Sequence, residues 1–138
     1  MKLKTAVLCA GILCLSSGLA LAAADAEIRV GPDSTVDTST GTLTVKSVNA
    51  PRDGFLVVYT VDDGKPAEPI GHAEIKQGDN PNVAVILDET PKSGDRLALI
   101  LHDDTGRTGE YEFGVNGSQE DPPTLADGQV VMATVTVE

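Results

Sequence analysis

The stretch that decides the fold is Arg96–Phe113, which reads RLALILHDDTGRTGEYEF. It opens with an unbroken apolar run from Leu97 to Leu101 and turns polar at His102. A strand with apolar residues at consecutive positions buries both faces, whereas a strand with one wet face alternates apolar and polar residues. We therefore predict a central strand that is covered on both sides, and we expect any functional chemistry where this strand leaves the core.

Other short segments with strand patterns surround this run, at a spacing of roughly 8–12 residues. Gly54–Val61 is rich in β-branched and aromatic residues, and Asn82–Leu87 places its larger apolar residues at alternate positions. No helical periodicity is visible after residue 24. The predicted strands are Thr42–Val48, Gly54–Val61, Ile70–Ile75, Asn82–Leu87, Arg96–His102, Glu110–Val115 and Gln129–Glu138, with a weak edge strand around Ile28–Val30.

Turn-forming residues separate these segments. Asp53-Gly54, Asp63-Gly64, Asn116-Gly117 and Asp127-Gly128 are dipeptides that accept positive φ angles, and most prolines fall between the apolar runs. About seven or eight short antiparallel strands with such punctuation predict a β-sandwich, with a small closed barrel as the alternative. Because the chain has only two Phe, two Tyr and no Trp, we expect an aliphatic core.

The N-terminus has the pattern of a secretory signal peptide. Lys2 and Lys4 precede a mostly apolar segment from Val7 to Leu21, and the small residues Ala20–Ala24 offer two A-x-A cleavage sites. The apolar segment is too short for a typical membrane span, although a retained N-terminal anchor is the alternative. We predict a signal peptide over residues 1–24, a flexible leader or edge strand over 25–41, and a β-sandwich domain over 42–138.

The net charge of the chain narrows the possible partners, and the positions of the cysteines bear on disulfide bonds. The full chain has a net charge of −11, and removal of Lys2 and Lys4 would make it −13. Such a charge disfavours nucleic acid and anionic lipid as ligands, because both require clusters of Lys and Arg. Both cysteines, Cys9 and Cys14, lie in the predicted signal peptide, so the mature domain would contain no disulfide. We expect a periplasmic or secreted domain with no membrane insertion after signal cleavage.

The acidic loop is the first candidate site; it carries Asp103, Asp104, Glu110 and Glu112 around two glycines. Calcium is bound by six to eight oxygen ligands, which a D-x-[DN]-x-[DN]-G loop supplies. Counted from Asp104, Gly109 falls at the required sixth position, but Gly106 and Thr108 replace two ligands and Val115 replaces the final acid. An EF-hand loop is excluded, and a looser, weak calcium site formed by the four acids remains a hypothesis beside a solvated acidic hairpin.

His72 and His102, the only two histidines, are the second candidate site. Strand pairing could bring them together near the acids that follow His102, and histidine is the commonest transition-metal ligand. A His/Asp-based metalloenzyme is therefore one hypothesis. The alternative is that His102, which follows Ala98 and Ile100 at alternate positions, closes a core face with a hydrogen bond. No serine-nucleophile elbow and no Gly-rich phosphate loop is present in the sequence.

From about Thr44 to the C-terminus, the chain resembles an uncharacterised secreted domain of unknown function found in archaeal and bacterial cell-surface and exported proteins. The residues that carry this resemblance are Asp53–Val58, Ile70-Gly71-His72, Leu97–Asp103, Gly109–Phe113 and Asp127–Val131. The resemblance implies an all-β, immunoglobulin-like module outside the cytoplasm, and it implies no activity. We expect a non-catalytic module that binds an unidentified protein or envelope partner or has a structural role, without a resident cofactor unless calcium binds.

Overall fold

The computed structural model describes residues 2–6 and 26–138, so the predicted cleavage positions at residues 20–24 lie outside the described residues. Within these ranges the chain forms eleven β-strands and one short 3-10 helix, η1. The elements are β1 (Leu3–Ala6), β2 (Glu27–Arg29), β3 (Thr35–Asp37), β4 (Thr42–Ala50), β5 (Gly54–Asp62), β6 (Lys65–Ile75), β7 (Gly78–Ile86), β8 (Arg96–Asp103), η1 (Val115–Gly117), β9 (Leu125–Ala126), β10 (Gln129–Val130) and β11 (Met132–Val137). In the described part, no helix is long and apolar enough to span a membrane.

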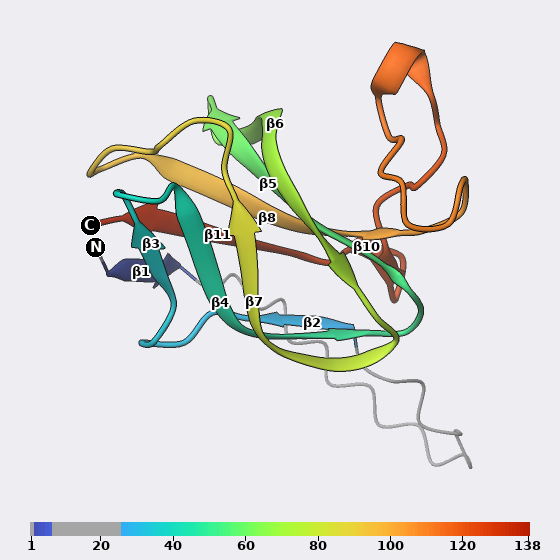
Figure 1. The fold of residues 1–138 in the computed structure, drawn as a ribbon, viewed down its shortest axis with the longest axis horizontal. Helices are drawn as coiled ribbons and strands as arrows, with labels where there is room; N and C mark the ends of the chain where they lie inside the picture. The colour runs from blue at the N-terminus through green and yellow to red at the C-terminus, as the bar shows by residue number, and fades with distance from the viewer. Residues whose placement is uncertain (1, 7–25) are drawn as a thin grey trace.

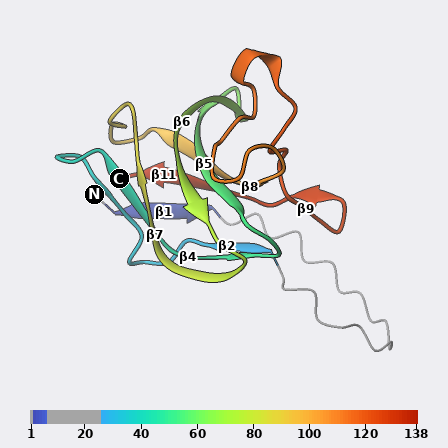
Figure 2. The same ribbon diagram turned by 45° about the vertical axis from the view of Figure 1, so that its right-hand side comes forward.

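The strands form two larger sheets and a small hairpin, and every pair is antiparallel. One sheet has the order β1-β11-β8-β5-β6, and the other gathers β2, β3 and β7 around β4. In Figure 1, β4 and β7 run across the direction of β8 and β11, and Figure 2 shows the same strands after a turn of 45° about the vertical axis. The chain is therefore all β with antiparallel sheets in a sandwich arrangement, as the sequence predicted.

The interior core lies between the two sheets and is entirely aliphatic. Leu97, Leu99 and Leu101 of β8 point into it, since alternate residues of a strand face the same side. The opposing sheet contributes residues such as Leu43 and Val85, which are completely buried. The predicted aliphatic core is thus confirmed, and so is the alternation predicted for the strands that carry these residues.

A second apolar cluster covers the outer face of the five-stranded sheet. It contains Phe55, Val57 and Tyr59 of β5 beside Ala98 and Ile100 of β8, all of them buried. The inner and outer residues of β8 are consecutive in sequence, which explains the unbroken apolar run. The prediction that this strand is covered on both sides is confirmed.

The covering loop, residues 104–124, supplies the outer layer (Figure 1, orange). A strand was predicted at Glu110–Val115, and this prediction is wrong, because that segment is irregular and leads into η1. Gly114 has a left-handed φ of 78°, and the N–H of Glu112 donates to the side chain of Asp121 instead of to a neighbouring strand. The alternation of acids and aromatics in this segment does not mark a strand. It reflects the two aromatic residues, Tyr111 and Phe113, which both pack against the ring of His102.

Tight turns occur at three of the four predicted dipeptides. The β5–β6 hairpin turns at Asp63 and Gly64, with φ angles of 48° and 74°. Two successive positive φ angles match the twist of a two-residue hairpin, and Asp and Gly tolerate them well. Asp53-Gly54 is different, because Gly54 is the first residue of β5, and a Cβ there would lie 1.9 Å from the carbonyl oxygen of His102. Gly54 permits close strand contact instead of a turn.

The ends of the chain differ from prediction in three places. The predicted edge segment forms two short strands, β2 and β3, that both pair with β4. The predicted last strand is divided at Val131, where the chain leaves the β9–β10 hairpin and pairs with β8 as β11. The third difference is β1, which lies in the predicted signal peptide and pairs with β11 at the edge of the five-stranded sheet.

Candidate functional site

The structure brings every phenylalanine, tyrosine and histidine of the sequence into one ring cluster. Its members come from β5, β6, β8 and the covering loop, and they are Phe55, Tyr59, His72, His102, Tyr111 and Phe113. Tyr111 is central, with its ring centroid 5.6 Å from Phe55, 5.0 Å from His72 and 5.4 Å from His102. These distances lie in the range in which aromatic pairs attract each other. The two histidines are therefore linked through the ring of Tyr111.

His102 is held at both ring nitrogens. The side chain is buried, with Nδ1 2.7 Å from the carbonyl oxygen of Asp121 and Nε2 3.1 Å from the hydroxyl of Tyr59. A carbonyl oxygen can only accept, so Nδ1 carries the proton and donates it to Asp121. In the neutral ring, Nε2 then accepts from the Tyr59 hydroxyl, which leaves the hydroxyl of Tyr111, 3.0 Å away, to donate to the oxygen of Tyr59.

This arrangement favours uncharged side chains throughout. Burial lowers the pKa of His102, because desolvation disfavours the imidazolium form. Burial also raises the pKa of Tyr59 and of Tyr111, so neither hydroxyl ionises near neutral pH. The result is a directed chain of hydrogen bonds from Tyr111 through Tyr59 and His102 to Asp121. It fixes the covering loop to the sheet, and it matches the alternative in which His102 closes a core face with a hydrogen bond.

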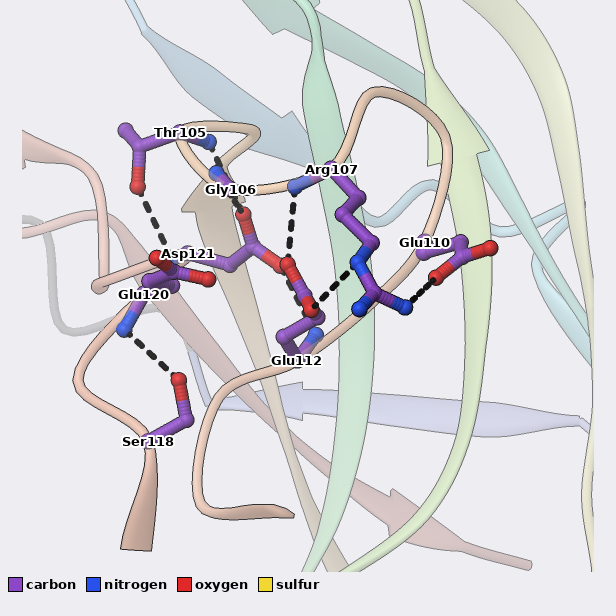
Figure 3. A network of polar contacts seen from close by, with 8 residues as sticks. All are labelled: Thr105, Gly106, Arg107, Glu110, Glu112, Ser118, Glu120 and Asp121. Carbon is purple, nitrogen blue, oxygen red and sulfur yellow. Dashed lines mark hydrogen bonds and ion pairs between the residues drawn. The ribbon is translucent and has the colours of Figure 1, made fainter. Parts of the chain in front are cut away.

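Asp121 is the residue that the sequence analysis did not single out for this role. It is completely buried and has a left-handed φ of 54°. One carboxylate oxygen accepts the N–H groups of Thr105 and Gly106 at 2.8 Å and 3.2 Å, and the other accepts that of Glu112 at 2.7 Å. Figure 3 shows this carboxylate between the two arms of the covering loop. The sequence signal, an acid followed by two prolines, is too common to have identified it.

The four acids proposed as calcium ligands are each paired within the protein. Asp103 accepts from the hydroxyl of Thr124 at 2.6 Å, and Asp104 accepts from the N–H of Gly109 at 2.8 Å. Glu110 and Glu112 both contact Arg107; Nη1 of the arginine lies 3.4 Å from Glu110, and its backbone N–H donates to Glu112 at 2.8 Å (Figure 3). The predicted hairpin, in which these acids oppose each other across a ladder, is wrong because the loop contains no such pairing.

Two carboxylates approach each other elsewhere in the same loop. A Cβ at Gly106 would lie 2.1 Å from Oε2 of Glu112 and 2.6 Å from Oε2 of Glu120, so both carboxylates lie against this glycine and would have to shift if it carried a side chain. The nearby Glu112 carboxylate raises the pKa of Glu120, because a protonated Glu120 can donate a hydrogen bond to Glu112 and the repulsion between the two charges is relieved. Across residues 2–6 and 26–138, no group of three or more His, Cys, Asp or Glu side chains is arranged to hold a metal ion. Calcium binding by the acidic loop stays a hypothesis beside the solvated acidic loop.

The predicted metal site at His72 and His102 is only partly assembled. His72 is exposed on β6 and packs edge-on against Phe55 at 5.9 Å, whereas His102 is buried beneath Tyr111. The rings belong to one cluster, but both nitrogens of His102 are already used. A metal could bind His102 only after one of these two hydrogen bonds is broken.

Comparison with known proteins places the chain in a family without a known activity. No curated protein and no solved structure matches it. One family model, described as a domain of unknown function (DUF7282), matches residues 32–138, which contain β3 through β11 and the whole ring cluster. This match covers more than half of the chain. The chain therefore belongs to the family described as domain of unknown function DUF7282.

Proposed function

We propose that this chain is an exported, non-catalytic β-sandwich module with a binding or structural role at the cell envelope. The observation that carries the non-catalytic part is the state of His102. A general base or a metal ligand needs a ring nitrogen that faces its substrate or metal, whereas Nε2 of the buried His102 faces the hydroxyl of Tyr59 and Nδ1 donates to the carbonyl oxygen of Asp121. The histidine and tyrosine side chains, which are the most reactive in the domain, thus help to form a second packed cluster.

A binding role is supported by apolar side chains that the fold leaves on the surface. Leu125 and Val130 are direct partners across the β9–β10 hairpin, and they are 61% and 44% exposed. Adjacent exposed aliphatic residues are typical of sites that contact other molecules. A protein or envelope partner fits this surface better than nucleic acid, because the chain carries a net charge of −11.

The export proposal rests on the leader pattern in residues 1–24, and intact-mass analysis tests it. The full chain with a C-terminal tag is expressed in a bacterial host and recovered from the periplasmic, membrane and cytoplasmic fractions. We expect soluble periplasmic protein whose N-terminus is Ala23 or Asp25, as the small residues at 20–24 imply. Membrane-bound material that retains Met1 would contradict the proposal.

The non-catalytic proposal is tested by native mass spectrometry of the exported protein with zinc, nickel or calcium. We expect no stoichiometric metal adduct that depends on histidine. The matched variants are His72→Ala, which removes an exposed ring, and His102→Gln, which removes the buried one. A 1:1 adduct lost in both variants would support the metalloenzyme hypothesis instead.

A further inference from the structure

The outer edge of β11 is covered by the chain's own N-terminal residues. β1 pairs antiparallel with β11, with Leu3 opposite Val137 and Ala6 opposite Thr134. Leu3 is 8% exposed and belongs to the interior core, and the N–H of Glu138 donates to the carbonyl oxygen of Lys2 at 3.0 Å. An extended segment with one aliphatic anchor therefore fits this edge.

Because β1 lies within the segment that we propose is removed on export, this inference rests on the proposed function. Removal of β1 would make β11 an edge strand. Its sequence, MATVTV, contains no charge and no proline, and its pairing with β8 shows no register shift. Proteins usually protect exposed edges with charges, prolines or bulges. An edge without this protection is suited to accept another strand.

The direction of the backbone groups on β11 follows from two hydrogen bonds. The N–H of Val137 donates towards β8, to Asp95, whereas that of Glu138 donates towards β1, to Lys2. Successive residues of a strand point their N–H groups to opposite sides. The N–H groups of Thr134 and Thr136 therefore point to the β1 side, and they would receive an incoming strand.

We propose that this edge binds an extended basic segment of a partner protein, anchored by an aliphatic side chain at the place that Leu3 occupies. Charge complementarity favours a basic segment, because the domain without residues 1–24 would have a net charge of −13 and the sequence of the occupying strand has lysine on each side of Leu3. A second copy fits less well. Two such domains repel each other because both are strongly acidic. Pairing through one six-residue strand would also bury less surface than a stable dimer interface, which buries about 1,200–2,000 Å².

The test uses the exported protein and a synthetic peptide with the sequence of residues 2–6, KLKTA. Binding is followed by nuclear magnetic resonance, with shift changes expected at the amides of Thr134 and Thr136. The peptide KDKTA, in which the anchor is charged, should bind at least about tenfold more weakly, because burying a leucine side chain is worth more than one decade in affinity. Equal binding of both peptides would overturn the proposal.

A proline variant separates edge pairing from folding. Thr136→Pro removes an N–H that points away from β8, so the β8–β11 ladder should persist while peptide binding is lost. Thr136→Ala is the matched control and should bind as the exported protein does. If Thr136→Pro does not fold, Thr134→Pro provides the same test at the next outward N–H. Binding that survives in a folded proline variant would overturn the proposal.

The remaining outcomes distinguish this proposal from the one on which it rests. Protein that retains Met1 would overturn the export proposal and this one together. Protein that begins at Ala23 or Asp25 but does not bind KLKTA would overturn only the edge proposal. A dimer in light scattering that is lost in Thr136→Pro would assign the edge to a second copy and overturn the proposed partner.

Discussion

Asp121 offers the sharpest test of the covering loop. We consider Asp121→Gly, which removes the carboxylate but keeps the left-handed φ of 54° accessible. The carboxylate accepts three backbone N–H groups at 2.8, 3.2 and 2.7 Å. A hydrogen bond to a charged group contributes about 1.5–3 kcal/mol, so three give an upper bound of about 9 kcal/mol. Because the freed N–H groups lie in a surface loop and can regain water, we expect a loss of about 3–5 kcal/mol in the free energy of unfolding.

The assay is urea unfolding of the full chain, followed by far-UV circular dichroism and by tyrosine fluorescence. The chain has no tryptophan, so Tyr59 and Tyr111 of the ring cluster are the fluorophores. Asp121→Asn is the control, since it tolerates the same backbone and keeps one oxygen for Thr105 and Gly106; we expect a loss of about 1–3 kcal/mol. A loss below about 1 kcal/mol for Asp121→Gly would refute the role of this carboxylate as the anchor of the loop.

The other predictions concern the core, pH and calcium. Leu99 is completely buried, so Leu99→Ala should lower the free energy of unfolding by about 2–5 kcal/mol in urea, and a loss below about 1 kcal/mol would mean that β8 is not central. The pKa of His102 is lowered in the folded state, so below about pH 6.5 the unfolded chain takes up a proton that the folded chain does not. The free energy of unfolding should therefore decrease as the pH is lowered, by up to about 1.4 kcal/mol per pH unit. His102→Gln should lack this contribution in urea titrations between about pH 4.5 and 7, and an unchanged slope would contradict the assignment. Calcium should raise the melting temperature no more than sodium at matched ionic strength, because the acids of the acidic loop are already paired; a larger, saturable calcium shift would support the calcium site.

Much of the fold could be predicted from local patterns. The run Leu97–Leu101 indicated a strand with two covered faces, and the structure places Leu99 inside the sandwich and Ile100 beneath the covering loop. The alternation in Asn82–Leu87 correctly separated buried Val85 from Ile86, which is 73% exposed. These successes share one cause, since the period of apolar residues directly records which faces of a strand are buried.

The covering loop could not be predicted in the same way. Tyr111 and Phe113 alternate with acids as in a strand, but they face the sheet from an irregular segment stabilised by Asp121. The contacts of the acidic loop could not be predicted for a related reason. Its acids are close in sequence, yet each finds a different partner, such as Thr124 for Asp103 and Arg107 for Glu110. Nearness in sequence gave no information on these contacts.

The sequence by itself determined the all-β fold class, the aliphatic interior and the two covered faces of β8. These features depend on the period of apolar residues along a short segment. The tertiary structure alone decided that all six rings meet, that both nitrogens of His102 are occupied, and that β1 covers the edge of β11. These contacts join residues far apart in the chain. They are fixed by strand order, register and the path of one loop, which no local pattern encodes.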